Sequence, residues 1–585
     1  MMILKENGFG KAGGMEKAGI IHNADREFCF AEEKDEFVVR IYTKAGDMDT
    51  VTLFFQDKYI PVQKKDTRGQ AVMEKVACDG IRDYYEARVT IHMLCMRYYF
   101  AFTDTNGETL YYGNYNFYKE KPEDIYAMFD CPQNVREEEL FAIPDWAAGK
   151  IVYQIFVDRF ASDKELTADW YKEKLHFRDR FGGNLAGITK KIPYLSELGA
   201  EVLYLTPIFK AGTSHKYDTI DYMEIDPDFG TGEDLRNLVK AAHAHGMYVI
   251  LDGVFNHTST RFFAFADLLK NQEASHYRDW YYPEQFPIKE TGTPTYRTFG
   301  YHGGMPKLNC RNEEVQEYIF KVIAHWTKEC GIDGWRLDVG DEIGHAFWKK
   351  FRVRLREINP RALIVGEIWH YAAEFLRGDE WDSVMNYRFY QAVLHFAAKR
   401  QIGPTAFAEE LDMLRGRLHT KVFPVLWNLI GSHDTPRFLY EAGERKEALC
   451  LASAIQLLSP GMPMIYYGDE AGMTGGKDPD CRRGMLWEEK RRDAALYGWY
   501  QKLAVLRKKY PSIAKGTRQW IKTEDESGLL IWRMELPGQE SVTVVLHNAK
   551  TKTELAEYKG QPDILGESVF DGILQPCQVA VFVER

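Results

Sequence analysis

Two carboxylic acids end two consecutive apolar segments of the chain. Asp338 ends GWRLD (334–338), and Glu367 ends ALIVGE (362–367). Cleavage of a glycosidic bond requires two carboxyl groups, one that donates a proton and one that acts as nucleophile or base. Neighbouring strands lie about 4.8 Å apart, so their ends can hold two such groups at the roughly 5–5.5 Å found in retaining glycosidases. The spacing therefore predicts Asp338 and Glu367 as a catalytic pair.

Arg336 precedes Asp338 by two residues. Residues two apart on a strand point to the same side, so the arginine and the carboxylate share a face. Such a pair by itself indicates a structural ion pair, but in an active site the cation would favour the charged form of Asp338 that a nucleophile needs. Glu367 follows an apolar segment and lies beside Trp369, where partial burial would favour the protonated form of a general acid.

Polar residues also follow other apolar segments. A single residue of this kind is more often a helix N-cap or a turn former than a catalytic group. Several acids that meet at one rim are different, because like charges raise one another's pKa values and active sites use such clusters. The additional candidates are Tyr217, Asp252, Asn256, His257, His370, His433 and Asp434.

Metal catalysis is the competing interpretation of these residues. Asp252, His257, His433 and Asp434 could be arranged as a metal site. The sequence contains no HExxH motif, and Arg336 beside the acids argues against a catalytic dication. We therefore favour chemistry carried by the carboxyl groups.

The elements that must position these residues are short apolar segments that alternate with segments of helical period. Near-continuous apolar strands separated by helices predict a parallel sheet that is covered on both faces. Eight such units favour a (β/α)8 barrel, whose active site lies at the carboxyl ends of the strands, over a doubly wound open sheet. The predicted strands are 151–157, 201–205, 247–252, 334–338, 362–367, 382–387, 426–431 and 463–467.

The patterns outside the barrel predict additional domains. Short alternating segments, with Asn106-Gly107 as a hairpin turn, predict an N-terminal β domain. About 80 residues separate the third barrel strand from the fourth, which is too long for a structureless loop. The predicted organisation is a tail (1–20), an N-terminal β-sandwich (21–118), a linker (119–149), a barrel (150–510) with an inserted domain (258–315), and a C-terminal β-sandwich (511–585).

Composition excludes some classes of partner. The 585-residue chain has a net charge of −11 and lacks a long basic block, so neither nucleic acid nor a membrane is an expected partner. Its nine cysteines include no CxxC pair, which indicates reduced thiols. The first residues lack the apolar core of a signal peptide, and no stretch approaches the roughly 20 apolar residues of a membrane span. The sequence therefore predicts a cytoplasmic protein.

The motifs at the predicted strand ends resemble those of the α-amylase family of glycoside hydrolases, in their order and spacing and over nearly the whole chain. MPKLN (305–309) is similar to the marker of the branch that contains neopullulanases, cyclomaltodextrinases and maltogenic amylases. The N-terminal β domain fits that branch, where it resembles a starch-binding module. The matching motifs are VDRF (157–160), DGVFNH (252–257), GWRLD (334–338), EIWH (367–370), IGSHD (430–434) and GMPMIYYGDE (461–470).

The resemblance implies a role for each candidate residue. Asp338 would be the nucleophile that forms a covalent glucosyl-enzyme, Glu367 the acid/base, and Asp434 the stabiliser of the transition state through the sugar hydroxyls. Arg336 would orient Asp338 and keep it ionised. The remaining substrate-binding positions are His257 and His433 as hydrogen-bonding residues, Tyr217 as a stacking ring, Asp252 as a support beneath the site, and Trp369, Glu342 and His370 toward the leaving-group side.

Two stretches depart from the branch. VGDE (339–342) stands where branch members commonly carry VANE, so that Asp341 replaces an amide while Glu342 is retained. Branch members often bind calcium through an Asn/Asp-rich loop and a GGD turn, whereas this chain has ASDKELTADWYKEK and GGN. A calcium ion takes about 6–8 oxygens, and several of the carboxylates are missing. The resemblance implies no required cofactor and leaves Asp163, Asn184 and Asn256 as candidate calcium ligands.

The implied function is that of a retaining α-glucan hydrolase. It would cleave α-1,4 bonds in cyclodextrins, maltooligosaccharides and pullulan, with some α-1,6 cleavage and transglycosylation, as a homodimer through the N-terminal domain. One alternative is an exo-acting oligo-1,6-glucosidase, although that group usually carries QPDLN and lacks the N-terminal domain. Another is a non-catalytic amylase-like protein, such as the ectodomain of a transporter heavy chain, which lacks the full set of acids.

Overall fold

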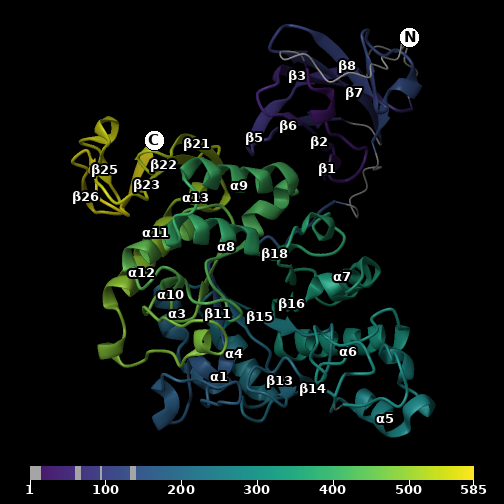
Figure 1. Cartoon of the computed structure of the whole chain (residues 1–585), viewed down its shortest axis with the longest axis vertical. Helices are drawn as coiled ribbons and strands as arrows, with labels where there is room; N and C mark the ends of the chain where they lie inside the picture. Colours follow the sequence, from purple (N-terminus) through teal and green to yellow (C-terminus); the bar gives the residue numbers. More distant parts are fainter. Residues whose placement is uncertain (1–14, 60–67, 92–94, 132–139, 291, 585) are drawn as a thin grey trace. The chain divides into compact units, whose positions relative to one another are not determined.

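The computed structural model describes residues 15–59, 68–91, 95–131, 140–290 and 292–584 (Figure 1). The first fourteen residues of the predicted tail and residues 132–139 of the predicted linker lie outside this description. The chain divides into two compact units. One comprises 1–142 with 373–379 and 405–423, and the other comprises 143–372, 380–404 and 424–585.

The second unit is built on a closed barrel of eight parallel strands. All eight predicted strands are confirmed. Because the first strand pairs with the last, the sheet is a closed barrel and not a doubly wound open sheet. Each strand is short, and all residues of the eight strands are buried except Tyr248 at the start of the third strand, as expected when a sheet is covered on both faces. In barrel order the strands are β11 (Val152–Ile155), β12 (Val202–Leu205), β15 (Tyr248–Gly253), β16 (Gly334–Leu337), β17 (Leu363–Gly366), β18 (Ser383–Asn386), β19 (Trp427–Leu429) and β20 (Met462–Tyr466).

Helices surround the barrel because each has one apolar face that must be covered. Capping side chains fix where two of them begin: the Thr231 hydroxyl accepts a hydrogen bond from the Asp234 N–H, and the Asn312 side chain accepts hydrogen bonds from the backbone after it. Figure 1 shows the helices around the strands. They include α3 (Ile192–Leu198), α4 (Gly232–Ala244), α6 (Glu313–Cys330), α7 (His345–Ile358), α8 (Tyr387–Val393), α11 (Lys446–Leu457) and α12 (Ala494–Lys509).

The predicted insertion lies between β15 and α6. It contains the helix α5 (Phe263–Asn271) and a series of turns, and α6 begins at Glu313, slightly before the predicted boundary at residue 315. The insertion is attached to the barrel at its base, where the Leu308 N–H donates to the Asn256 carbonyl (2.9 Å) and the Thr258 N–H donates to the Pro306 carbonyl (3.1 Å). The insertion therefore starts and ends at the carboxyl end of β15.

The N-terminal domain is a β-sandwich, as predicted, with a large shared apolar core. The Asn106-Gly107 hairpin joins β7 (Met96–Asp104) to β8 (Thr109–Gly113), and Gly107 has the positive φ (81°) that the turn requires. The domain does not end at Tyr118, because β10 (Phe129–Asp130), within the predicted linker, pairs with β7. The other strands are β1 (Cys29–Glu33), β2 (Glu36–Lys44), β3 (Met48–Asp57), β4 (Gly69–Val72), β5 (Glu74–Cys78), β6 (Arg82–Thr90) and β9 (Asn116–Tyr118).

The C-terminal domain has one main antiparallel sheet. Residues 553–574, which contain two small hairpin-like sheets, pack on this sheet through an apolar core that includes Ile531, Tyr558 and Phe582. The second layer is thus smaller than a full β-sandwich would have. In the described residues, no helix is long and apolar enough to cross a membrane. The strands of the main sheet are β21 (Thr517–Glu524), β22 (Leu529–Glu535), β23 (Ser541–His547) and β28 (Val579–Glu584).

Candidate active site

Strand register brings Asp338 and Glu367 together. Leu337 pairs with Gly366 across β16 and β17, so the two acids are the next residues on adjacent strands. The Glu367 N–H donates to the Leu337 carbonyl at 2.9 Å, which continues the ladder to the point where the carboxyl groups emerge. Their side chains are 7% and 6% exposed, respectively. Two acids that are 29 positions apart in sequence therefore lie side by side at the ends of two adjacent strands.

Arg336 binds both acids and a third one beneath them. Its Nη1 lies 2.8 Å from Asp338 Oδ1 and 2.9 Å from Asp252 Oδ1, and its Nη2 lies 2.7 Å from Glu367 Oε1. The ion pair predicted between Arg336 and Asp338 is present, and Asp252 binds the same guanidinium. The sequence did not predict that the Arg336 guanidinium also pairs with Glu367. One guanidinium thus serves three carboxyl groups.

The electrostatics of this cluster differ from the expectation that Arg336 simply keeps Asp338 charged. Burial raises the pKa of Asp338 well above its ordinary value; Arg336 opposes this rise, and the negative charges of Glu367 and Asp252 add to it. Burial likewise raises the pKa of Asp252 to about 6, against the lowering effect of Arg336. The guanidinium itself stays protonated, because the neighbouring acids raise its pKa despite its burial. The cluster therefore favours the retention of a proton among its carboxyl groups.

The backbone after β16 holds the second oxygen of Glu367. The Val339 N–H donates to Glu367 Oε2 at 3.0 Å, and the Trp369 indole N–H donates to Oε1 at 3.3 Å. Val339 adopts a left-handed conformation (φ 46°), which is unfavourable for a β-branched residue and is found mainly where the surroundings impose it. Trp369 is held in turn by stacking on Tyr387, with ring centroids 4.2 Å apart. The acid/base candidate is thus fixed at both oxygens.

Asp434 faces the pair from the end of β19. Arg482 Nη2 lies 3.2 Å from Asp434 Oδ1, and the Arg482 Nε–H donates to the His433 carbonyl at 2.8 Å. His433 Nδ1 is hydrogen-bonded to the Gln154 amide (2.8 Å), and its Nε2 to the Tyr217 hydroxyl. The histidine and tyrosine predicted to bind substrate are therefore also parts of one buried network.

Two histidines of the site, His257 and His433, are uncharged at neutral pH. Burial lowers the pKa of His257 to about 3 and that of His433 well below its ordinary value, and the cations Lys307 and Arg482, respectively, lower them further. Neither ring nitrogen of His257 has a hydrogen-bond partner among the residues that the structure describes, and the ring stacks on Phe299 (centroids 4.9 Å apart). A neutral imidazole offers one donor and one acceptor, so His257 can bind a sugar hydroxyl with either nitrogen.

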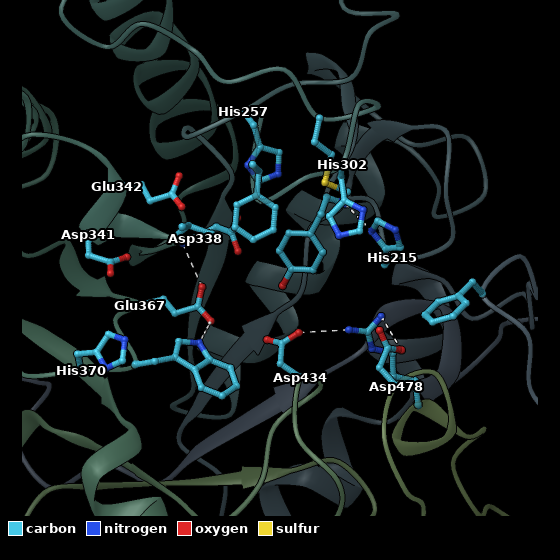
Figure 2. Close-up of a pocket in the computed structure, with 17 residues that line it drawn as sticks. His215, His257, His302, Asp338, Asp341, Glu342, Glu367, His370, Asp434 and Asp478 are labelled. Carbon is cyan, nitrogen blue, oxygen red and sulfur yellow. Dashed lines mark hydrogen bonds and ion pairs between the residues drawn. The ribbon is translucent and has the colours of Figure 1, made fainter. Parts of the chain in front are cut away.

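Part of this set of side chains lines one cavity of about 730 Å³ (Figure 2). Figure 2 shows Asp338, Glu367 and Asp434 around its centre, with His370, Asp341 and Glu342 to one side. Of the predicted residues, Asp252, Arg336 and His433 lie behind the wall rather than on it. The predicted residues that line the cavity are Tyr217, His257, Asp338, Glu342, Glu367, Trp369, His370 and Asp434.

Sequence reasoning missed part of the site. Gln154 and Tyr204 lie within apolar strands, and a polar residue inside such a strand was the available signal; the Tyr204 hydroxyl donates to Asp252 Oδ2 at 2.6 Å. The other missed residues come from loops, where no periodicity marks them. They are Phe177, Phe299, His302, Met305, Val339, Asp478 and Arg482, all on the cavity wall.

The candidate calcium ligands do not form a cation site. Asp163 and Asn184 bind each other, with the Asn184 amide donating to Asp163 Oδ1 at 2.7 Å, and Asn184 Oδ1 caps α2 (Leu185–Lys190). The Asn256 amide oxygen accepts a hydrogen bond from the Lys307 ammonium. Within the described ranges, no group of three or more His, Cys, Asp or Glu side chains could hold a metal ion. The residues present therefore do not fit calcium.

Two family models match the chain. The model described as "Alpha amylase, catalytic domain" matches residues 154–516, and "Alpha amylase, N-terminal ig-like domain" matches residues 15–133. The first covers the barrel with its insertion, and the second covers the N-terminal β-sandwich including β10.

Individual proteins match over nearly the whole chain. A "Cyclomaltodextrinase" of Geobacillus thermopakistaniensis is 39% identical over 92% of this chain and 92% of its own length. "Neopullulanase 2" of Thermoactinomyces vulgaris is 40% identical over 91% of each chain. A solved structure titled "Cyclomaltodextrinase" superposes with a TM-score of 0.90 at 34% identity, covering 97% of this chain and 98% of its own.

Proposed function

The chain belongs to the α-amylase family of glycoside hydrolases, in the branch of the cyclomaltodextrinases, neopullulanases and maltogenic amylases, and we propose that it opens cyclodextrins and cleaves α-1,4 bonds in maltooligosaccharides and pullulan. It is a retaining enzyme, as is general in this family. The observation that carries the proposal is the pair of acids at adjacent strand ends, bound by one guanidinium and facing Asp434 across a cavity.

The first chemical step joins the sugar to the enzyme. Asp338 attacks the anomeric carbon as the bond to the leaving sugar breaks, and Glu367 gives its proton to the glycosidic oxygen. As the Asp338 charge is consumed, Arg336 keeps its pairing with Asp252 and Glu367 and so remains fixed. Asp434 and the neutral His257 bind the hydroxyls of the distorted ring.

The second step releases the sugar. Glu367, now ionised, takes a proton from a water molecule or from the hydroxyl of an acceptor sugar, and the resulting oxygen displaces Asp338 from the anomeric carbon with overall retention. Val339 and Trp369 hold Glu367 through both steps, because each donates a hydrogen bond to one of its oxygens. The same residue thus serves as acid and then as base.

The leaving-group side supports transfer to sugars as well as to water. Trp369 is 41% exposed beside the acid/base, where its ring can stack on an acceptor sugar. Asp341 and Glu342 line the same side of the cavity. We propose from this arrangement that the enzyme has transglycosylation activity and cleaves some α-1,6 bonds.

Product analysis on a panel of substrates tests the proposal. Rates on β-cyclodextrin, pullulan and soluble starch should be compared under the same conditions, with the products separated by length. We expect cyclodextrin to be opened faster than starch is degraded, with maltose and glucose accumulating. Starch hydrolysis that is much faster than cyclodextrin hydrolysis would refute the proposed substrate class.

The proposed location is the cytoplasm. Most of the nine cysteines are buried, and the chain contains no CxxC pair. Proteins of reducing compartments use cysteine in this way, which supports the proposal. Cell fractionation of the native host measures it directly.

A further inference from the structure

Lys307 makes three contacts with oxygen atoms at the edge of the active site. Its ammonium donates to the side-chain oxygen of Asn256, to the Glu342 carbonyl at 3.1 Å, and to Glu342 Oε2 at 3.0 Å. The lysine side chain is 19% exposed and Asn256 is fully buried. An ammonium has three donors, and here each of them meets an oxygen.

These contacts join three separate segments of the chain. Asn256 belongs to the loop after β15, Lys307 to the end of the insertion, and Glu342 to the short helix η8 (Gly340–Glu342) after β16. The backbone pairs the insertion with the same loop, since His257 and Lys307 form an antiparallel bridge. Besides the end of the insertion, where Met305 lines the cavity, the other two joined segments also carry residues that line it, namely His257 and Glu342. The ammonium therefore lies where it can set the positions of both.

The oxygens around the ammonium are of the kind that a hard cation binds. An amide oxygen, a backbone carbonyl and a carboxylate are the usual ligands of a calcium ion. The chain supplies its own positive charge at this point, which explains why Asn256 does not fit as a calcium ligand. The charge also acts on its neighbour, because after burial it is the next cause that lowers the pKa of His257 and keeps that ring neutral.

We propose that the ammonium of Lys307 acts as a built-in cation that takes the place of a divalent ion and positions His257 and Glu342 for catalysis. Lys307 is a positioning residue, because it touches the cavity wall and not the reacting atoms. The inference rests on the proposed function for its activity readout, but its stability readout is independent of any substrate.

Two substitutions of Lys307 test the proposal. Lys307→Met removes the charge and keeps the volume of the stem. Lys307→Asp adds a carboxylate to the existing oxygens and so creates a set that calcium can bind. Lys289→Met is the matched control, because Lys289 is an exposed lysine of the same insertion. Each protein is studied with EDTA, with CaCl2, and with NaCl of equal ionic strength.

The expected results separate a cation role from an ordinary surface pair. The wild type and Lys289→Met should have the same apparent Tm and kcat/KM in EDTA and in calcium. Lys307→Met should lose about 10-fold or more in kcat/KM, since small displacements in a site cost up to about 100-fold, and calcium should not restore it. Lys307→Asp should be less stable in EDTA, and calcium should raise its apparent Tm by at least about 2–4 °C and recover activity.

Three results would overturn the proposal. They are a wild type that loses activity or stability in EDTA and regains it with calcium, a Lys307→Met enzyme with wild-type Tm and kcat/KM, and a Lys307→Asp protein whose Tm is the same in EDTA and in calcium. If the wild type opened no cyclodextrin, the proposed function would fail, while the three Tm comparisons would still decide the role of Lys307.

Discussion

Arg336 carries a single positive charge among Asp252, Asp338 and Glu367. If all three acids were ionised, the buried cluster would hold an uncompensated negative charge, which a low-dielectric interior disfavours. A proton shared by the acids lowers this cost, because it reduces the net charge of the cluster from −2 to −1. A retaining mechanism needs the same arrangement, because one carboxyl must be ionised to attack while the other is protonated to donate. The retention of a proton by these carboxyl groups thus follows from the presence of three acids around one cation.

Replacing either acid should separate their roles. Asp338→Asn should lower kcat by more than about 100-fold on every substrate, because the covalent step is lost. Glu367→Gln should lower kcat/KM, which reports the first step, about 10²–10⁴-fold on maltooligosaccharides but much less on an aryl maltoside whose leaving group needs no proton. Steady-state rates on the two substrate types provide the measurement. Equal losses on both substrates for Glu367→Gln would contradict its role as the acid.

The pH profile should show the raised pKa values of the cluster. Asp338 must be ionised to attack, and burial raises its pKa well above the ordinary value, so activity on the acidic side should be lost at a higher pH than an ordinary aspartate would give. Asp252→Asn removes a negative charge that raises the pKa of Asp338, so the acidic limb of kcat/KM should move to lower pH. A limb that stays in place, or moves upward, would contradict this coupling.

At the scale of elements, β16 and β17 decide where the acids meet. Both strands contain a glycine in close contact with a neighbour: the position of a Cβ on Gly334 is occupied by β17 backbone, and that on Gly366 by the Trp381 ring. The absence of side chains lets β17 approach its neighbours, and Glu367 follows Gly366 directly. The register that aligns Leu337 with Gly366 then places the acids side by side. The packing of Trp381 against Gly366 therefore affects the position of Glu367 relative to Asp338.

Gly366→Ala should disturb both stability and activity. The added methyl group would overlap Trp381, and overpacking of this kind typically costs about 1–3 kcal/mol, so the apparent Tm should fall and kcat should fall with it as Glu367 is displaced. Gly344→Ala is the control, since a Cβ there meets no atom within 4 Å. Thermal unfolding and cyclodextrin kinetics measure the two effects. A Gly366→Ala enzyme as stable as the control would show that this contact does not constrain β17.

At the scale of the whole molecule, the chain consists of two compact units, one of which contains all the residues that line the cavity. The other contains the N-terminal β-sandwich. In the resembling branch, this domain pairs with a second copy and narrows the partner's active site. We propose the same homodimer here, because it would give an N-terminal domain with no catalytic side chain an effect on substrate choice.

The dimer can be tested by mass and by specificity together. Light scattering at micromolar concentration should give twice the 67.8 kDa of the chain. Dilution to a concentration at which monomers prevail should reduce the ratio of cyclodextrin to starch activity, because the cleft would open. A monomer at all concentrations with an undiminished cyclodextrin preference would exclude this explanation of specificity.

The sequence by itself determined the barrel and the identity of the main acids. Apolar strands that alternate with helices leave few arrangements that bury both faces of a parallel sheet, so the eight strands were predictable from local pattern. Asp338 and Glu367 follow such strands directly, Asp434 lies five residues after the last residue of β19, and strand ends converge at one rim. Local signals were weakest outside the barrel, where β10 joins the N-terminal sheet through pairing with a strand more than 20 residues away.

Only the tertiary structure decided how the charges are shared. Three contacts join residues that are distant in sequence. Arg336 binds Glu367 as well as Asp338, Arg482 binds Asp434, and the Lys307 ammonium donates a hydrogen bond to the Asn256 side-chain oxygen. Burial, which sets the pKa of Asp338, is likewise a property of the packed molecule. Side-chain periodicity records which face of an element is covered, but it does not record which distant charge lies opposite, and for that physical reason the electrostatics of the site required the fold.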